Sequence, residues 1–253
     1  MSVQVMRSIA LSLTVFLGLS LLPAGCSESA SENQATEEML SELSEIRQKR
    51  HKELQDQLDS DGGYSINTDR IDDVVDTFES ASEDLPPEIR QKLKRQAALL
   101  KRAKAVFVPY EEAYNGFVGL GGLDPVTITD AESVEERIRL LGVLIQENER
   151  IDKAVPELLR QMDGDLNETN EHIKLIHAVR QTDRVMLPSM RDALQILLTH
   201  LGDFEVNEDG MLMFAESVPQ EDIDQYNEHI DIVIAASEEQ ARLQQQNLES
   251  KQP

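Results

Sequence analysis

The sequence contains no tryptophan, and its other aromatic residues are only six Phe and four Tyr. Because ligand grooves are usually lined by apolar and aromatic side chains, this scarcity argues against an aromatic-lined binding groove. Basic residues are also few: 24 Lys and Arg stand against 48 Asp and Glu, for a net charge of −24. Such a surface repels nucleic acid, since affinity for phosphates comes mainly from Lys and Arg. It also disfavours broad adhesion to anionic lipid.

The sequence motifs of several enzyme classes are missing. There is no Gly-x-Ser-x-Gly nucleophile elbow, no Walker A Gly-Lys pair and no His-Glu-x-x-His. Residues 119–122 are rich in glycine, but they do not complete a dinucleotide-binding pattern and follow a helix instead of a strand. None of the five histidines has Glu three residues before it, which is the ligand spacing of di-iron bundles. We therefore expect no cofactor and no histidine-based metal site.

Long hydrophobic runs are absent except near the N-terminus. Residues 9–22 form an apolar run with only small polar interruptions, and a single basic residue, Arg7, precedes it. This run is shorter than the ~20 residues that a helix needs to cross a bilayer, and it is typical of a secretory signal. We therefore expect residues 1–26 to be a signal peptide that directs export of the remaining chain.

Cys26 is the only cysteine, so it has no intramolecular disulfide partner. The segment Pro23-Ala24-Gly25-Cys26 resembles the lipobox of bacterial lipoproteins, in which a diacylglycerol is attached to the Cys thiol before cleavage in front of it. Ala24, Gly25 and Cys26 fit that pattern, whereas Pro23 stands where Leu or another apolar residue is usual. The resemblance covers residues 1–26 alone and implies lipidation at Cys26. Ordinary signal-peptidase cleavage, which would release a soluble product, is the alternative.

The resemblance also implies a location. Ser27 follows the cysteine, and it does not resemble the Asp that favours inner-membrane retention of Gram-negative lipoproteins. We therefore expect an extracytoplasmic protein held by its lipid in the bacterial outer membrane and facing the periplasm, with a soluble periplasmic or secreted protein as the alternative. The expected partners are the membrane, through the N-terminal lipid, and other envelope proteins, but not nucleic acid. The oligomeric state is left open.

Apolar residues recur every three to four positions through most of the exported chain, which is the period of an amphipathic helix. After a polar tether at residues 27–35, we expect a helical bundle domain over 36–248 and a disordered tail over 249–253, with the Gln-rich residues 240–253 fraying. The expected helices cover about 36–58, 71–81, 89–117, 134–162, 173–201 and 223–241. Long helices with one narrow apolar face pack side by side. The predicted fold is therefore all-α, an elongated antiparallel helical bundle whose first helix extends as a coiled-coil arm.

Two kinds of signal mark the interiors and ends of these helices. Pro109, Pro156 and Pro188 lie inside expected helices, where the missing N–H kinks or divides a helix. Thr129 and Glu132 have the spacing of a capping box for the fourth helix. We therefore expect long helices that bend at prolines.

Residues 204–214 lack helical spacing. Two short apolar runs flank Asp209-Gly210, which is a strong signal for a β-hairpin. The region 205–216 can also be aligned with an EF-hand calcium loop. The corresponding metal ligands would be Glu205, Asn207, Asp209 and Glu216. Against calcium, Glu replaces the usual Asp at the first loop position and Pro219 interrupts the second helix, so we prefer the hairpin and keep a divalent-cation site as the alternative.

Charge is patterned along two of the expected helices. Residues 69–84 contain seven acids and no base after Arg70, whereas residues 90–104 contain seven bases and no acid. Packing of these two helices against each other would bring the two blocks together. Each exposed ion pair contributes only ~0.2–1 kcal/mol, so the pattern would guide register more than stability. We prefer this intramolecular pairing to a basic face for lipid headgroups or an acidic partner.

Three functional hypotheses follow from these patterns. The first is a non-enzymatic envelope lipoprotein, a helical bundle that serves as a binding or scaffold module. The second is a binding module for calcium or a small ligand centred on residues 205–216. The third is an enzyme with a carboxylate site formed by Asp and Glu from different helices, which requires a concave pocket that holds paired acids. The export signal, the helical pattern and the missing motifs favour the first.

Overall fold

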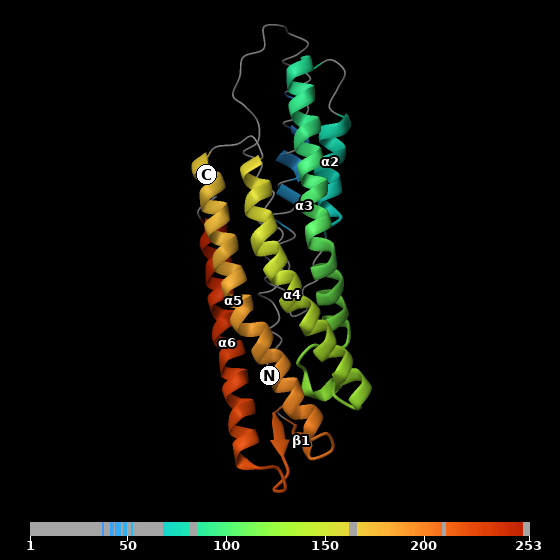
Figure 1. Ribbon diagram of the computed structural model, residues 1–253, viewed down its shortest axis with the longest axis vertical. Coiled ribbons are helices and arrows are strands. Elements are labelled where there is room, and N and C mark those ends of the chain that lie inside the picture. Colours follow the sequence, from blue (N-terminus) through green and yellow to red (C-terminus); the bar gives the residue numbers. More distant parts are fainter. Residues whose placement is uncertain are drawn as a thin grey trace.

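The computed structural model describes residues 68–80, 85–161, 166–208 and 211–249, together with scattered positions between 37 and 52. These residues are mostly helical, with one two-stranded antiparallel hairpin (Figure 1). In chain order the elements are α2 (Arg70–Ser80), α3 (Pro87–Gly119), the 3-10 turn η4 (Pro125–Thr127), α4 (Ala131–Gln161), α5 (Leu166–Thr199), β1 (Phe204–Val206), β2 (Leu212–Phe214) and α6 (Gln220–Glu249). The prediction of an all-α bundle with one small hairpin is therefore confirmed.

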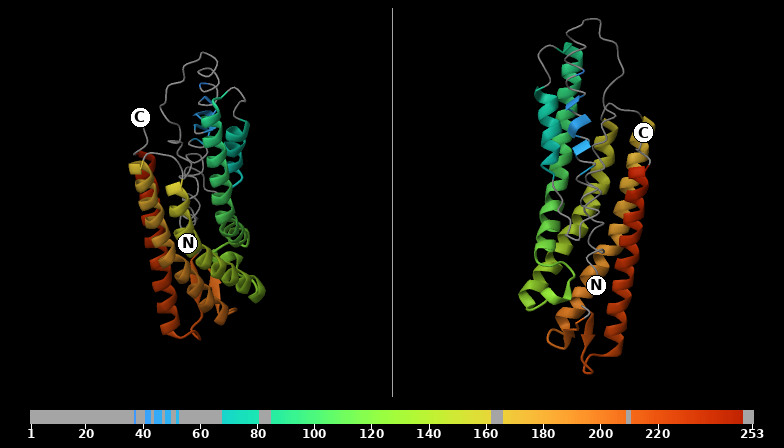
Figure 2. Two further views of the ribbon diagram at one scale, coloured as in Figure 1. Left: turned by 45° about the horizontal axis from the view of Figure 1, so that its top comes forward. Right: turned by 180° about the vertical axis from the view of Figure 1, so that it is seen from behind.

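Successive helices pack against one another, α2 on α3, α3 on α4, α4 on α5 and α5 on α6. The long helices run along the longest axis of the molecule, from α2 and α3 on one side to α5 and α6 on the other (Figures 1 and 2). Successive helices run in opposite directions, so the bundle is elongated and antiparallel, as predicted. The connection from α3 to α4 and the hairpin therefore lie at the same end of the molecule. We call this end, residues 120–130 and 200–219, the hairpin end.

The N-terminus of α4 is capped by Asp130 and not by Thr129. The Asp130 Oδ1 atom accepts a hydrogen bond from the backbone N–H of Ser133 at 2.8 Å, and Thr129 Oγ1 donates to Asp130 Oδ2 at 3.1 Å. The predicted capping box of Thr129 and Glu132 is therefore wrong by one position. An Asp satisfies the free N–H groups as well as Thr does, and its negative charge also interacts favourably with the positive end of the helix dipole.

Each of the helices α3, α4 and α5 contains an internal proline, at Pro109, Pro156 and Pro188 respectively. All three helices continue past their proline, so Pro188 does not divide α5. The packing of neighbouring helices offsets the backbone hydrogen bond that each proline loses. Pro87, in contrast, occupies the first position of α3, where proline is favoured because its missing N–H has no partner inside the helix.

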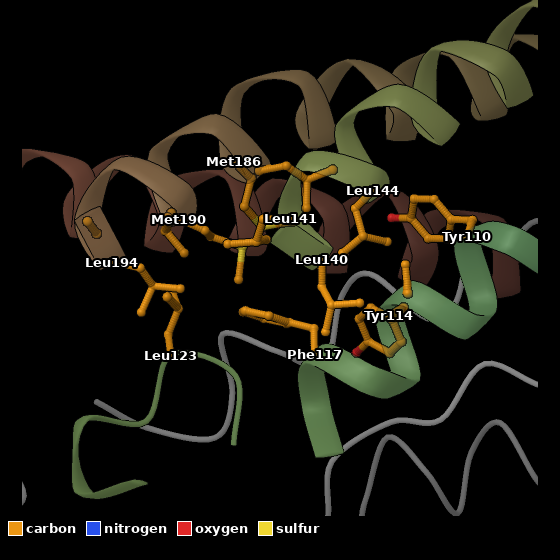
Figure 3. Packing of buried hydrophobic residues seen from close by; sticks show 14 of the residues in the cluster. Tyr110, Tyr114, Phe117, Leu123, Leu140, Leu141, Leu144, Met186, Met190 and Leu194 are labelled. Carbon is orange, nitrogen blue, oxygen red and sulfur yellow. The ribbon is translucent and has the colours of Figure 1, made fainter. Parts of the chain in front are cut away.

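The main hydrophobic core lies where α3, α4, α5 and α6 meet (Figure 3). Its side chains recur at steps of three and four along each helix, as the sequence pattern predicted. Figure 3 shows among them Tyr110, Tyr114 and Phe117 of α3, Leu140, Leu141 and Leu144 of α4, and Met186, Met190 and Leu194 of α5. Full burial of one large apolar side chain contributes roughly 1.5–3 kcal/mol, so this core is the main source of the bundle's stability.

A second, smaller hydrophobic cluster joins α2 to the first half of α3. Val74 and Phe78 of α2 and Ala97 of α3 are almost fully buried in it. Ile46, which falls in the range of the first predicted helix, also packs against this cluster. Most of residues 36–58 lie outside the described residues, so the coiled-coil arm stays a prediction.

Ion pairs connect α2 and α3 beside this second cluster. Lys101 Nζ lies 2.7 Å from Glu79 Oε1, and Lys104 Nζ lies 2.7 Å from Asp69 Oδ1 and 2.6 Å from Asp72 Oδ2. The predicted pairing of the acidic block with the basic block is confirmed at these positions. The hydrogen bonds that Lys104 donates to the two Asp carboxylates raise its pKa. Because the acids are largely exposed, each pair contributes ~0.2–1 kcal/mol and mainly sets the register of the two helices.

The connection from α3 to α4 is held in place by Arg137, whose side chain is buried. Arg137 Nη1 donates to the Gly122 carbonyl oxygen at 3.1 Å, and Nη2 donates to that of Thr127 at 2.8 Å. Gly121 has a φ of 94°, and a Cβ atom at this position would lie 2.2 Å from Thr127 Oγ1. The turn therefore requires glycine, both for its backbone conformation and for space.

The hairpin packs its inner face on the bundle. Phe204 pairs with Phe214 across the two strands, and their ring centroids are 6.2 Å apart. Phe214 also contacts Tyr226 of α6 at 5.4 Å between ring centroids, in an edge-to-face arrangement. The hairpin that the sequence predicted over residues 204–214 is confirmed in its two strands, while its tip, residues 209 and 210, lies outside the described residues.

The last helix, α6, continues to Glu249. The helix therefore runs through the Gln-rich stretch as far as residue 249, and the expected fraying of that stretch stays a prediction. Gln240 itself is completely buried in the bundle and bonds to a core carboxylate. Residues 250–253, in the predicted disordered tail, lie outside the described residues.

Candidate functional site

Cys26, the predicted lipidation site, lies outside the described residues, as do the predicted signal peptide and the polar tether. Lipidation at this position therefore stays a prediction. No helix in the described part of the chain has both the length and the apolar composition to span a membrane.

The predicted calcium ligands are distributed along the hairpin. Glu205 lies in β1 and is exposed, Glu216 is exposed beyond β2, and Asp209 lies outside the described residues. Asn207 Oδ1 accepts a hydrogen bond from the backbone N–H of Met211 at 2.9 Å, so this side chain stabilises the turn. Among the described residues, no group of three His, Cys, Asp or Glu side chains gathers closely enough to hold a metal ion. Because Asp209 is not described, the calcium site stays a prediction.

An open pocket of about 310 Å³ lies between α5 and α6 beside the hairpin. Its walls are residues at steps of three and four on each helix, so each helix turns one face toward the pocket. The lining residues are Asp192, Gln195, Ile196 and Thr199 of α5, His200 directly after it, and Asp222, Gln225 and His229 of α6. The pocket is therefore rich in groups that donate or accept hydrogen bonds.

His200 and Asp222 connect the two walls of this pocket. His200 Nε2 lies 2.8 Å from Asp222 Oδ2, and a carboxylate at this distance fixes the orientation of the imidazole. Asp192 Oδ1 accepts hydrogen bonds from Arg191 Nε and Nη2 at 3.0 and 2.9 Å. His229 Nδ1 is shielded from solvent and has no hydrogen-bond partner among the described residues. His229 therefore offers a polar atom that a ligand in the pocket could satisfy.

The carboxylate-enzyme hypothesis required a concave pocket that holds paired acids, and this pocket holds two carboxylates, Asp192 and Asp222, together with two imidazoles. Motif searching missed these residues because they come from two helices and share no local spacing. A charge signal in the sequence could have located them. Residues 192–241 contain 13 acidic residues and two histidines but no Lys or Arg.

A second polar cluster lies inside the core and joins three helices through Asp183 of α5. Arg180 Nη1 lies 3.1 Å from Asp183 Oδ2, and Tyr110 of α3 donates its hydroxyl to the same oxygen at 3.3 Å. Gln240 of α6 donates its amide N–H to Asp183 Oδ1. All four side chains are at most 1% exposed. We call these four residues the core network.

The core network extends to α4 through Asn148, whose Nδ2 donates to the Arg180 carbonyl oxygen at 3.1 Å. The Arg180 guanidinium also lies over the Tyr110 ring, 5.1 Å from its centroid. Burial raises the pKa of Asp183, and the positive charge of Arg180 opposes this effect. Burial, strengthened by the charge of Asp183, raises the pKa of Tyr110 well above its usual value. Because each buried polar group needs its partner, the network specifies how the four helices align.

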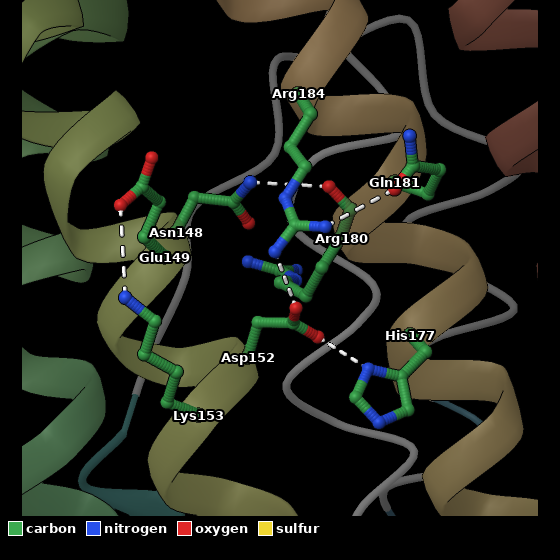
Figure 4. A network of polar contacts seen from close by, with 8 residues as sticks. All are labelled: Asn148, Glu149, Asp152, Lys153, His177, Arg180, Gln181 and Arg184. Atoms are coloured by element: carbon green, nitrogen blue, oxygen red, sulfur yellow. Dashed lines mark hydrogen bonds and ion pairs between the residues drawn. The ribbon is translucent and has the colours of Figure 1, made fainter.

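A third polar cluster lies at the surface, where Asp152 of α4 contacts two side chains of α5 (Figure 4). Arg184 Nη2 and His177 Nδ1 each lie 2.5 Å from an oxygen of Asp152. The Asp152 side chain is only 10% exposed, and it lies one helical turn from Asn148. The cluster therefore adds a charged connection between α4 and α5 next to the core network.

Sequence analysis missed the buried charged residues because it followed only apolar side chains. Arg180 and Asp183 nevertheless fall on the α5 stripe, at steps of four, three and four between Ile176 and Leu187. Arg137 likewise lies three residues after Val134 and four before Leu141 on the α4 stripe. The available signal was a charged residue at a position where the helical period places the side chain in the core.

Comparison of the chain with protein-family models, with curated proteins and with solved structures found no match. We therefore infer its function from its own residues.

Proposed function

We propose that this chain is a non-enzymatic envelope lipoprotein, tethered to a membrane by lipid on Cys26, whose helical bundle is a binding module. The tether is supported by the apolar run of residues 9–22 and by the lone cysteine that follows it. The binding role is supported by one observation above all, the pocket between α5 and α6 with its convergent polar groups. Binding sites are typically concave and carry a few well-placed polar groups of this kind.

The pocket is built on two long helices, which hold its side chains more rigidly than loops would. The contact of His200 with Asp222 fixes one pair of polar groups before any ligand arrives. Nearby, the inner face of the hairpin packs on Tyr226 of α6. A pocket prepared in this way binds with less loss of conformational entropy than one that must order itself.

The charge of the pocket indicates the class of ligand. Asp192 and Asp222 lie in its walls and none of its lining residues is Lys or Arg, although Arg191 pairs with Asp192 beside it, so Asp222 carries most of the attraction for a cation. A concave surface whose lining charges are acidic raises the local concentration of cations. The volume of about 310 Å³ suits a small molecule. The proposed ligand is therefore a small organic cation with hydrogen-bonding groups.

Titration of the full-length protein with spermidine, a small polyamine, tests this ligand class by NMR of labelled histidine side chains. The expected result is a saturable shift of the His200 and His229 signals. Asp222→Asn should weaken binding by about tenfold, which corresponds to one lost charge-assisted contact. Asp231→Asn is the matched control, because Asp231 lies exposed on the same helix and does not line the pocket.

Absence of histidine shifts at millimolar spermidine would overturn the proposed ligand class. Equal weakening by Asp222→Asn and Asp231→Asn would show attraction to the overall negative charge and would also overturn it.

The tether is tested separately by fractionating cells that express the wild type or Cys26→Ala. We expect the wild type in the membrane fraction and the variant in the soluble extracytoplasmic fraction, because stable anchoring requires the attached acyl chains. Recovery of both proteins in the soluble fraction would reject the lipid tether and leave the binding role to be judged by the titration.

A further inference from the structure

The outer face of the hairpin exposes two methionines. Alternate residues of a strand point to the same face, so Met211, just before β2, and Met213 share the face opposite to the one packed on the bundle. Their side chains are 54% and 50% exposed. Glu205 of β1 is the direct cross-strand neighbour of Met213, so the outer face combines thioether groups with a carboxylate.

Exposed apolar side chains are concentrated at the hairpin end. The described residues include four large apolar side chains that are clearly exposed, and Val126, Met211 and Met213 belong to this end. The fourth, Val185, lies within α5 at a distance from both connections. Scattered exposed apolar residues are ordinary, but their concentration at one end of the molecule indicates an interaction surface.

The hairpin and its immediate flanks carry four acids that form no ion pairs with described residues. These acids are Asp203, Glu205, Glu208 and Glu216, and all of them are exposed. Elsewhere in the molecule, Lys and Arg side chains accompany many of the acids, as at Lys101 and Glu79. The hairpin lies within residues 192–241, which contain no Lys or Arg at all. No basic residue of this segment therefore neutralises the negative charge of the hairpin.

We propose that the outer face of the hairpin docks a cationic amphipathic segment of another protein. Methionine side chains are flexible and polarizable, so Met211 and Met213 adapt to the apolar face of such a segment. The acids around them attract its Lys and Arg residues, which speeds association and selects against acidic partners. An anionic membrane surface is repelled by the same charge. This inference rests on the proposed role as a binding module and names the class of partner.

The test uses the full-length protein in mild detergent with methionine methyl groups labelled for NMR. The probe is a synthetic helical peptide of about 18 residues, five helical turns, with Leu along one face and Lys on the other. Two control peptides are used. The first has the same composition in scrambled order, and the second has Glu in place of every Lys. Only the first peptide should shift the Met211 and Met213 signals, while those of the buried Met186 and Met190 remain unchanged.

Two pairs of variants separate the hairpin from the general acidity of the protein. Met211→Ser with Met213→Ser should weaken binding of the amphipathic peptide by about tenfold or more, whereas Val185→Ser should leave it unchanged. Glu205→Gln with Glu208→Gln should weaken binding and reduce its dependence on salt. The same exchange at Glu112 and Glu238, which are exposed acids outside the hairpin, should have a much smaller effect.

Shifts at Met211 and Met213 together with selective loss in the hairpin variants would support the proposal. Equal binding of the scrambled peptide, equal effects of the two Glu pairs, or shifts produced by anionic vesicles instead of the peptide would overturn it. The peptide test reads out a surface separate from the tether and the pocket, so its failure can be distinguished from theirs. A protein that fractionates with the membrane and binds spermidine but ignores the peptide would reject the docking surface alone.

Discussion

Arg180 and Asp183 form an ion pair of 3.1 Å in the interior of the bundle, where the two side chains are 1% and 0% exposed. Removing two charges from water is costly, and their attraction repays that cost only with good geometry and further hydrogen bonds. Here Tyr110 and Gln240 supply those hydrogen bonds from two other helices. The pair is therefore part of a network that specifies the alignment of the helices.

Removal of one partner should cost more than removal of both. We expect Arg180→Met to lower the free energy of unfolding by about 3–5 kcal/mol, because it leaves a buried carboxylate without its cation. Adding Asp183→Leu should restore at least about 1 kcal/mol, since no isolated charge remains buried. Chemical denaturation of the two variants and the wild type measures this difference. Losses that simply add, so that the double variant is the least stable, would contradict the account.

The effect of Arg180→Met should depend on pH through Asp183. Burial raises the folded-state pKa of Asp183 above the usual value of 3.8. The folded protein therefore holds this proton more tightly than the unfolded chain does. The stability that results is fully present below pH 3.8 and is lost as the pH rises through the folded-state pKa. Without Arg180, whose charge opposes the rise, that loss becomes larger. We expect the deficit of the variant to be small at about pH 4 and to grow toward about pH 7. A deficit that stays constant or shrinks over this range would argue against an ionised core pair.

Three glycines should respond differently to alanine. Gly121→Ala should destabilise most, because it combines a φ of 94° with a Cβ position only 2.2 Å from Thr127 Oγ1. Gly202→Ala meets no atom but keeps a φ of 95°, so it should cost only the backbone strain of about 1–2 kcal/mol. Gly142→Ala, in open space on α4, should stabilise by about 0.5–1 kcal/mol. Thermal unfolding of the three variants gives the order, and a stable Gly121→Ala would refute the described turn.

The cap of α4 should depend on Asp130. We expect Asp130→Ala to cost about 1 kcal/mol, since the N–H of Ser133 loses its acceptor. Thr129→Ala should stay within about 0.5 kcal/mol of the wild type, because Thr129 caps no backbone group of the helix. Urea denaturation distinguishes the two variants. The reverse order would restore the capping box that the sequence pattern first indicated.

The helices, their antiparallel packing and the hairpin were predictable because each depends on a local pattern. Apolar periodicity marks the buried faces, as in the stripe that contains Tyr110, and Asp209-Gly210 marks the hairpin. The pairing of Lys104 with Asp69 and Asp72 followed from the two charge blocks. The helices, the hairpin and the charge pairing could therefore be predicted without knowledge of which distant residues are in contact.

The candidate site was not predictable in the same way. The pocket requires knowledge of how α5 and α6 align, and that alignment brings His200 beside Asp222 although 22 positions separate them. The core network depends on distant pairings as well, since 57 positions separate Gln240 from Asp183. A charged residue on an apolar stripe can lie at the surface or can form an ion pair in the core. The sequence does not distinguish these cases, because the further partners that such a pair needs come from other helices.

The central proposal is that this bundle is held at a membrane by lipid on Cys26, and its most direct test is mass spectrometry of the N-terminal peptide from the cell-derived protein. We expect a chain that begins at Cys26 and carries the mass of a diacylglyceryl thioether, with or without a further N-acyl group. An unmodified Cys26 thiol, or an N-terminus beyond residue 26, would contradict the lipid anchor.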